Sequence, residues 1–352
     1  MTPDDLDTIN YFPTIRSRQA ELKGYQHLRT STKQRIRPLV SLGKLGQLDQ
    51  PERILETIRN TIGGEGFVDL NSNPGQQCSG FDALRDPAGN YAAWRNLFTG
   101  DKQLTPAALL RDNVAERPFV RQVLQIENDH QVVAIRAKRP AQDLPLLQAA
   151  LSAVDDVNNV MIVLDFGYVR PSFAIKEQEA LRVISALRTI DESARIVVMA
   201  SSFPKAVSAF GDQRGTLEIL ERDFHARIGG DEVAIYGDHA AIYPEPFEPS
   251  ISRFVPRIDY CLEGAWLYER RRTDNGGYVA CADSIVTSPD WDEAFCDMAW
   301  GASIIRQTAD ACTTPAGFRA PSNWIAARVN MHIERQNEAA EHLAEDEFDD
   351  DN

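Results

Sequence analysis

The first 240 residues of the chain alternate between short β-prone apolar runs and segments with helical spacing. The β-prone runs are YFPTIR (11–16), IRPLVSL (36–42), GFVDL (66–70), LTPAALL (104–110), QVVAIRA (131–137), VMIVLDF (160–166), RIVVMAS (195–201) and EVAIYG (232–237). A chain that alternates strands and helices builds a parallel sheet, because each helix carries the chain back to the edge where the next strand begins. This alternation limits the fold more than any other feature of the sequence.

Helices are predicted between these strands, at residues 19–28, 51–62, 91–98, 116–127, 144–154, 174–190 and 216–228. One segment needs a decision between the two periods. VRQVLQI (120–126) is β-rich in composition, but Phe119, Val123 and Glu127 recur at a spacing near 3.6 residues. We therefore predict a helix there and assign the fourth strand to residues 104–110.

Eight such units suit a closed (β/α)8 barrel of the TIM type, and thus an α/β fold class. Residues 160–166 and 195–201 are almost continuously apolar, as in strands that are covered on both faces. An open doubly wound sheet is the alternative. No glycine-rich phosphate loop begins any predicted helix, which counts against a dinucleotide-binding fold.

The pattern changes after Pro244, where PEPFEPS forms a proline-rich connection. Strand character at 253–272, a turn at 274–278 and helices at 292–308 and 321–344 follow. We therefore expect a barrel over residues 1–243 and a C-terminal extension with a β-hairpin and helices over 244–335, packed on the barrel. Residues 336–352 are expected to form an acidic, disordered tail.

Charge is distributed unevenly around a net value of −15. Residues 334–352 hold nine acids and one base, whereas residues 16–44 hold eight bases and one acid. The overall acidity argues against a protein that coats nucleic acid. A solvated basic face is the favoured interpretation of residues 16–44, and a nucleic-acid contact through that face is the less favoured one.

Cysteine usage and hydropathy indicate the compartment. The five cysteines form no CxxC pair, so neither a disulfide framework nor a zinc site is indicated. The chain has no apolar run of the ~18 residues that a membrane span needs, and its first ten residues do not resemble a signal peptide. We expect a cytoplasmic protein with no membrane partner.

The predicted strands end in polar residues, and the C-terminal ends of barrel strands form the active sites of such folds. These residues are Arg16, Asp69, Arg136, Asp165, Ser201 and Ser202, with Asp238 and His239 after the last strand. One interpretation is a ligand site, where Arg16 and Arg136 hold a phosphate and Asp69, Asp165 and Asp238 position the ligand or an ion such as Mg²⁺ or Mn²⁺. The other is a buried network in which Arg136 bridges Asp69 and Asp165 to close the barrel.

Two short motifs near these positions are ambiguous. GDH (237–239) places a carboxylate beside an imidazole, which suits acid–base work or a hydrogen-bonded turn. ASSFP (200–204) offers hydroxyl groups for an anion but lacks the GxSxG pattern of a nucleophile elbow. Neither motif identifies a reaction.

Several segments resemble, as an ordered set, the beta-family proteins of bacterial genomes and P4-type satellite phages. They are YFPTIRSRQAEL, IRPLV, the strand that ends in Asp165, MASSFP, GDHAAIYPEP, PRIDY and NWIAARVNMHI, and the resemblance covers about residues 10–335. The positions that match the family pattern are Tyr11, Pro13, Glu21, Pro38, Ser201, Ser202, Phe203, Pro204, Gly237, Asp238, Pro244, Tyr260, Trp324 and His332. Ser41 and Met331 depart from it, because an acidic residue and a histidine are expected there, and both departures weaken a metal-centred interpretation.

The resemblance implies a protein of a mobile element that acts in phage defence or phage–host conflict. Combined with the polar strand ends, it favours a barrel mouth that binds a phosphate-containing ligand. A second hypothesis is a non-catalytic scaffold that docks a protein partner encoded by a neighbouring gene, such as a nuclease-like protein. A third is a metal-dependent nuclease or phosphodiesterase. Whether the protein is an enzyme, which ligand it binds and its oligomeric state are left open by the sequence.

Overall fold

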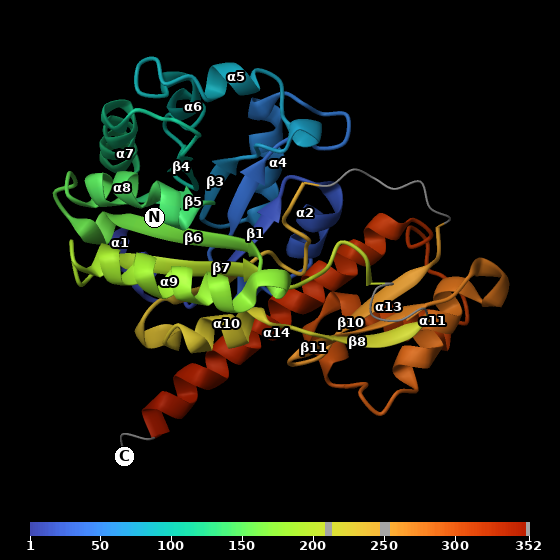
Figure 1. Ribbon diagram of the computed structural model, residues 1–352. Helices are drawn as coiled ribbons and strands as arrows, with labels where there is room; N and C mark the ends of the chain where they lie inside the picture. The colour runs from blue at the N-terminus through green and yellow to red at the C-terminus, as the bar shows by residue number, and fades with distance from the viewer. Residues whose placement is uncertain (208–212, 247–253, 350–352) are drawn as a thin grey trace.

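The computed structural model describes residues 1–207, 213–246 and 254–349. Within them, eight parallel strands close into a barrel in the order β1-β2-β3-β4-β5-β6-β7-β9 (Figure 1). The strands are β1 (Tyr11–Arg16), β2 (Leu39–Leu42), β3 (Gly66–Leu70), β4 (Leu104–Ala108), β5 (Val133–Ala137), β6 (Val160–Tyr168), β7 (Arg195–Ser201) and β9 (Ile235–Asp238). Because β1 pairs with both β2 and β9, the sheet has no free edge. The predicted (β/α)8 barrel is confirmed, and the open-sheet alternative is excluded.

Helices cover the outside of the barrel. They are α2 (Gln19–Gln26), α3 (Thr30–Arg35), α4 (Pro51–Ile62), α5 (Phe81–Leu84), α6 (Ala92–Asn96), α7 (Glu116–His130), α8 (Pro140–Leu151), α9 (Phe173–Arg188) and α10 (Glu221–Arg227). Residues 120–126 lie within α7, as their spacing predicts. The bounds of α4 match its sequence signals, with Pro51 in the first turn and Gly63 ending the helix at a φ of 65°.

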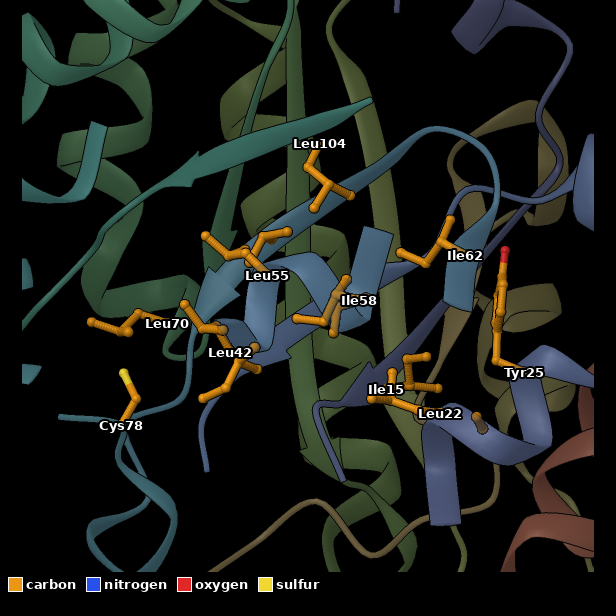
Figure 2. Close-up of a cluster of buried hydrophobic side chains, with 14 of the residues drawn as sticks. Ile15, Leu22, Tyr25, Leu42, Leu55, Ile58, Ile62, Leu70, Cys78 and Leu104 are labelled. Atoms are coloured by element: carbon orange, nitrogen blue, oxygen red, sulfur yellow. The ribbon is translucent and has the colours of Figure 1, made fainter. Parts of the chain in front are cut away.

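The apolar core lies on both sides of the barrel wall. Inside the barrel, Phe12, Phe67 and Met199 belong to one buried cluster. Helix α1 (Pro3–Asp7) and the residues after it add Leu6 and Ile9 to that cluster, and this helix was not predicted from the sequence. Outside the wall, Leu55 and Ile58 of α4 pack in a second cluster with Leu42 of β2 (Figure 2).

The C-terminal extension forms a lobe around a three-stranded antiparallel sheet in the order β10-β11-β8. The predicted hairpin is β10 (Arg257–Cys261) and β11 (Ala265–Arg270). Helices α11 (Gly277–Val286), α12 (Phe295–Met298) and α13 (Trp300–Asp310) belong to the same lobe. Helix α11 was not predicted from the sequence; it begins where only a turn was expected.

The third strand of this sheet corrects the sequence prediction. Residues 216–228 were expected to be one helix, but β8 (Arg214–Glu218) is a strand and α10 begins only at Glu221. Strand β8 pairs along its length with β11, which lies about fifty residues later in the chain. The pairing partner is remote, so the local sequence carries no signal of it.

Helix α14 (Pro321–Asp349) joins the two parts of the molecule. Its residues Val329 and Ile333 belong to the barrel cluster, while Trp324 and Met331 belong to the lobe cluster. In Figure 1 this red helix runs diagonally from the lobe past the barrel, and its last turns extend beyond the outline of both. The helix continues through position 335, where we expected the extension to end, and Gln336, the next residue, is 1% exposed.

Candidate functional site

Arg136 organises the C-terminal end of the barrel, which we call the mouth. From the end of β5 its guanidinium donates to Asp165 at 2.7 Å on β6, to Asp69 at 3.2 Å on β3 and to Ser41 at 2.8 Å on β2. Arg136, Asp69 and Asp165 are all buried. Burial alone would lower the pKa of Arg136, but the charges of Asp165 and Asp69 raise it, so the cation is fixed in place. One side chain therefore bridges both carboxylates that the sequence places here.

His239 completes this network from the turn after β9. Its Nε2 lies 2.8 Å from Asp165 Oδ1, and the backbone N–H of Gly167 donates to the same oxygen at 2.9 Å. Burial would raise the pKa of Asp165, but His239 and Arg136 hold it well below its usual range. A histidine whose ring is held by an ionised carboxylate is suited to proton transfer.

The turn that carries His239 is strained. Ala240 and Ala241 follow it with φ values of 48° and 59°, in the left-handed region that alanine disfavours. Such strain persists only where neighbouring contacts hold it, and it gathers at functional sites. Here the contacts are those of the buried residues around Asp238 and His239.

A cavity of about 230 Å³ opens above this network. Its charged lining residues are Arg16, Glu21, Arg136, Lys138, Asp165, Lys176, His239 and Glu245. Lys138 binds Asp69 at 3.1 Å. Lys176 of α9 donates to the carbonyl oxygens of Phe166 and Tyr168, and within the described residues it forms no ion pair with a carboxylate.

Arg16, the first predicted site residue, lies at the rim of this cavity and is paired. Its Nη2 lies 2.8 Å from Glu21 Oε1 in the first turn of α2, and the carboxylate also accepts the backbone N–H of Arg16 at 2.7 Å. Glu21 is 2% exposed, so this ion pair is an internal one. It attaches α2 to the end of β1.

The two serines are directed away from the cavity. Ser201 Oγ donates to the carbonyl oxygen of Ile242 at 3.0 Å, and both serines are fully buried. Ser202 binds Glu221 at the start of α10, through its backbone N–H and its hydroxyl. Burial raises the pKa of Glu221 despite these bonds. The serines therefore fix the loop after β7, and the cavity lining does not include them.

Asp238 belongs to a second buried cluster, apart from the mouth network. It accepts hydrogen bonds from Tyr11 at 2.8 Å and Tyr236 at 2.9 Å, and it lies 2.9 Å from His332 Nε2 on α14. Burial would lower the pKa of His332, but the charge of Asp238 outweighs it and raises that pKa to about 10. The neighbours Asp238 and His239 thus serve different clusters: Asp238 pairs with His332, and His239 with Asp165.

The three aspartates named as metal ligands are therefore divided between two places. Among the residues that the structure describes, no group of three His, Cys, Asp or Glu side chains is arranged to hold a metal ion. Asp69 and Asp165 are both bound by Arg136 instead. A guanidinium occupies the position between these carboxylates where a cation would sit.

Sequence reasoning missed Lys138 and Lys176. Lys138 lies two residues beyond Arg136, on the same side of the strand by alternation, and that spacing was available as a signal. Lys176 lies on the first turn of α9, and only the packing of that helix turns it toward the strand ends.

The two comparisons of the sequence with known proteins agree on one family. The sequence model of the Beta protein family matches residues 11–338. Protein beta of Enterobacteria phage P4 is 30% identical over 343 residues, which cover 96% of this chain and 95% of the relative. Among solved structures, a glycoside hydrolase family 5 enzyme of Prevotella bryantii aligns with a TM-score of 0.41 and 10% identity, over 68% of this chain and 91% of its own. No helix in the described ranges is long and apolar enough to cross a membrane.

Proposed function

Because this chain belongs to the Beta protein family, with a relative in phage P4, we propose that it is a mobile-element protein that acts in phage defence or phage–host conflict. We further propose that it does so by binding a phosphate-containing ligand in the mouth cavity. The resemblance in sequence supports the first part. The second part rests on the chemistry of the mouth.

The observation that carries the ligand proposal is the position of Lys176. Its ammonium group lines the cavity and is held by two carbonyl oxygens, without a carboxylate partner in the described residues. Lys138 lines the same cavity and is 42% exposed at its side chain. Two ammonium groups facing one cavity at the C-terminal end of a barrel favour an anionic ligand.

The charged side chains of the mouth network hold one another in position and need no ligand to do so. Arg136 is neutralised by Asp69 and Asp165, so its role is to hold the strand ends and not to bind the phosphate. His239, fixed by Asp165, faces the same cavity and is the one group of the mouth network placed to accept or donate a proton at the ligand.

The alternative, a non-catalytic scaffold, is supported by the bridge that Arg136 forms between Asp69 and Asp165. Arg136 joins Asp69 and Asp165 as a purely structural network would, and a scaffold needs nothing further from the mouth. The two hypotheses differ in Lys176, which a scaffold does not require. The metal-dependent nuclease has no supporting donor set in the described residues.

Thermal unfolding with a ligand panel tests the proposal. The panel contains Mg²⁺, Mn²⁺, nucleotides, cyclic nucleotides and short DNA. A ligand at about 100 times its Kd adds ~2.7 kcal/mol of stability and raises the Tm. We expect a phosphate compound to raise the Tm of the natural protein and to have less effect on Lys176→Gln. Lys102→Gln, an exposed lysine before β4 at the opposite end of the barrel, is the matched control. An equal shift in all three proteins would exclude the mouth.

The biological part of the proposal is tested by plating. A host that carries the element with this gene should plate a superinfecting phage less efficiently than one with the gene deleted. Restoring the gene with Lys176→Gln should not restore the difference, whereas Lys102→Gln should. Equal plating with and without the gene contradicts a defence role.

A further inference from the structure

A second cavity lies where the barrel meets the C-terminal lobe, and we call it the basic cleft. Its volume is about 350 Å³, within the range of roughly 300–1,000 Å³ that small-molecule sites occupy. Its described lining includes the six cations Arg16, Arg18, Lys44, Lys205, Arg257 and Arg328, and one acid, Glu21. It adjoins the mouth cavity, with which it shares Arg16, Glu21 and Ile242.

Part of this positive charge has no carboxylate partner among the described residues. Glu21 pairs with Arg16 at 2.8 Å, and Asp259 lies 3.0 Å from Arg257 and 2.7 Å from Arg328. Lys205 makes an interaction of its own, so the other five cations face these two carboxylates, an excess of three positive charges. The molecule as a whole carries a net charge of −15, so the cleft stands out from its surroundings. Exposed like charges repel one another unless an anion lies between them.

Arg328 gives the cleft a buried donor. It is 4% exposed on α14, it stacks on Phe203 with 3.9 Å between its guanidinium carbon and the ring centre, and its Nη1 donates to Asp259. Its Nε has no hydrogen-bond partner among the described residues. An unpartnered donor on a buried cation costs free energy, which an anionic ligand would recover.

Backbone groups add to the same attraction. Gln19 and Ala20, in the first turn of the eight-residue helix α2, line the cleft, and the N-cap residue Arg18 makes no side-chain cap there. Ser322 lies in the first turn of α14 and lines it too. The first N–H groups of a helix and its dipole both favour a negative group.

We propose that the basic cleft binds a small oligophosphate, such as pyrophosphate, tripolyphosphate or the phosphate chain of a nucleotide. The excess of three positive charges suits a ligand with several negative charges. The cleft is bounded by α2, α14 and the loop after β7. Its volume of about 350 Å³ fits a small molecule. The cleft adjoins the mouth and shares Arg16, Glu21 and Ile242 with it, but Arg18, Lys44 and Arg328 line the cleft alone, so this proposal does not depend on the function proposed for the mouth.

The test uses inorganic tripolyphosphate as the probe, measured by calorimetry at low and high salt. We expect binding that weakens as salt rises, because exposed charges are screened. The double variant Arg18→Gln/Lys44→Gln should weaken it at least tenfold. Both side chains are exposed, so the variant keeps the fold. Lys176→Gln, in the mouth, and Lys102→Gln, at the opposite end of the barrel, should bind as the natural protein does.

Further measurements distinguish a nucleotide from a free phosphate chain as the ligand. Tighter binding of adenosine triphosphate than of tripolyphosphate would identify a nucleotide, and equal binding would identify the phosphate chain alone; both support the cleft. The inference is overturned if tripolyphosphate does not bind, or if Lys176→Gln abolishes binding while Arg18→Gln/Lys44→Gln does not. Binding to long single-stranded DNA without binding to any small phosphate would overturn it as well. If tripolyphosphate binds the cleft but no compound of the panel binds the mouth, the proposed function is rejected and the inference about the cleft stands.

Discussion

At the scale of single residues, Arg136 joins more strand ends at the mouth than the other residues of its network. It is a buried cation that joins β5 to β2, β3 and β6. Removing one member of a buried ion network leaves its partners unpaired, which costs about 3–5 kcal/mol. We therefore expect Arg136→Met to lower the free energy of unfolding by about that amount, measured by urea denaturation.

A double-mutant cycle provides the control for this prediction. Asp165→Ala and Arg136→Met together should cost less than the sum of the two single changes, because the second change removes the group that the first left unpaired. A loss below about 0.5 kcal/mol for Arg136→Met would contradict a structural role for the bridge. The arginine would then be held in place for a ligand instead.

The pair of His332 and Asp238 makes a residue-scale prediction about pH. The pKa of His332 is raised to about 10 in the folded protein, from an ordinary value of 6.5. A raised pKa means that the protonated form stabilises the fold. This stabilisation is complete below pH 6.5 and disappears as the pH rises through 10. Chemical denaturation should therefore show a fall in stability between pH 6.5 and 10 that His332→Gln lacks. An identical fall in both proteins would show that His332 does not cause it.

At the scale of elements, the close approach of helices to α14 depends on two glycines. A Cβ on Gly24 of α2 would lie 2.6 Å from the carbonyl oxygen of Ala326. A Cβ on Gly301 of α13 would overlap the carbonyl oxygen of Ala327. Inserting a methyl group into such a contact costs roughly 1–3 kcal/mol. Gly24→Ala and Gly301→Ala should each lower the Tm. Gly264→Ala, in the β10–β11 turn, where a Cβ meets no atom within 4 Å, should leave it unchanged. A Gly24→Ala protein as stable as Gly264→Ala would show that α2 can move away from α14.

Strand β8 shows why an element can be assigned wrongly from its own sequence. RGTLE has no helical stripe and only one buried side chain, Leu217, so its periodicity is weak. It becomes a strand because β11 offers a complete row of backbone partners. A segment inserted between β7 and α10 of the barrel is thereby built into the sheet of the lobe.

At the scale of the whole molecule, α14 packs against both the barrel and the lobe, so we expect the two to unfold as one cooperative unit. It contributes to both clusters and pairs His332 with Asp238 and Glu334 with Arg29 of the barrel side. We expect tryptophan fluorescence and far-UV circular dichroism to report one coincident unfolding transition. Trp94 reports on the barrel, and Trp266 and Trp324 report on the lobe.

Shortening the chain tests this coupling. A chain that ends at residue 320 loses α14 and should show no cooperative transition, because Asp238 and both clusters are then exposed. A chain that ends at residue 340 keeps the α14 residues of both clusters and should unfold as the full chain does. A stable barrel in the shorter protein would contradict the single unit.

The fold class followed from the sequence because alternation of strands and helices is a local property. The strand at 66–70, the helix at 51–62 and the helical period of 116–127 can each be read from spacing alone. Polar residues at the ends of apolar strands likewise predicted that Asp69, Arg136 and Asp165 would meet, because parallel strands place their C-terminal ends together.

The rest was decided by tertiary contacts. Asp238 and His239 are neighbours in sequence, yet one binds His332 of α14 and the other Asp165 of β6. Ser201 and Ser202 face Ile242 and Glu221, and β8 joins a sheet whose other strands come later in the chain. The sequence alone determined which elements form and which strand ends are polar, because both depend on residues a few positions apart. Partner choice depends on residues up to hundreds of positions apart that only packing brings together.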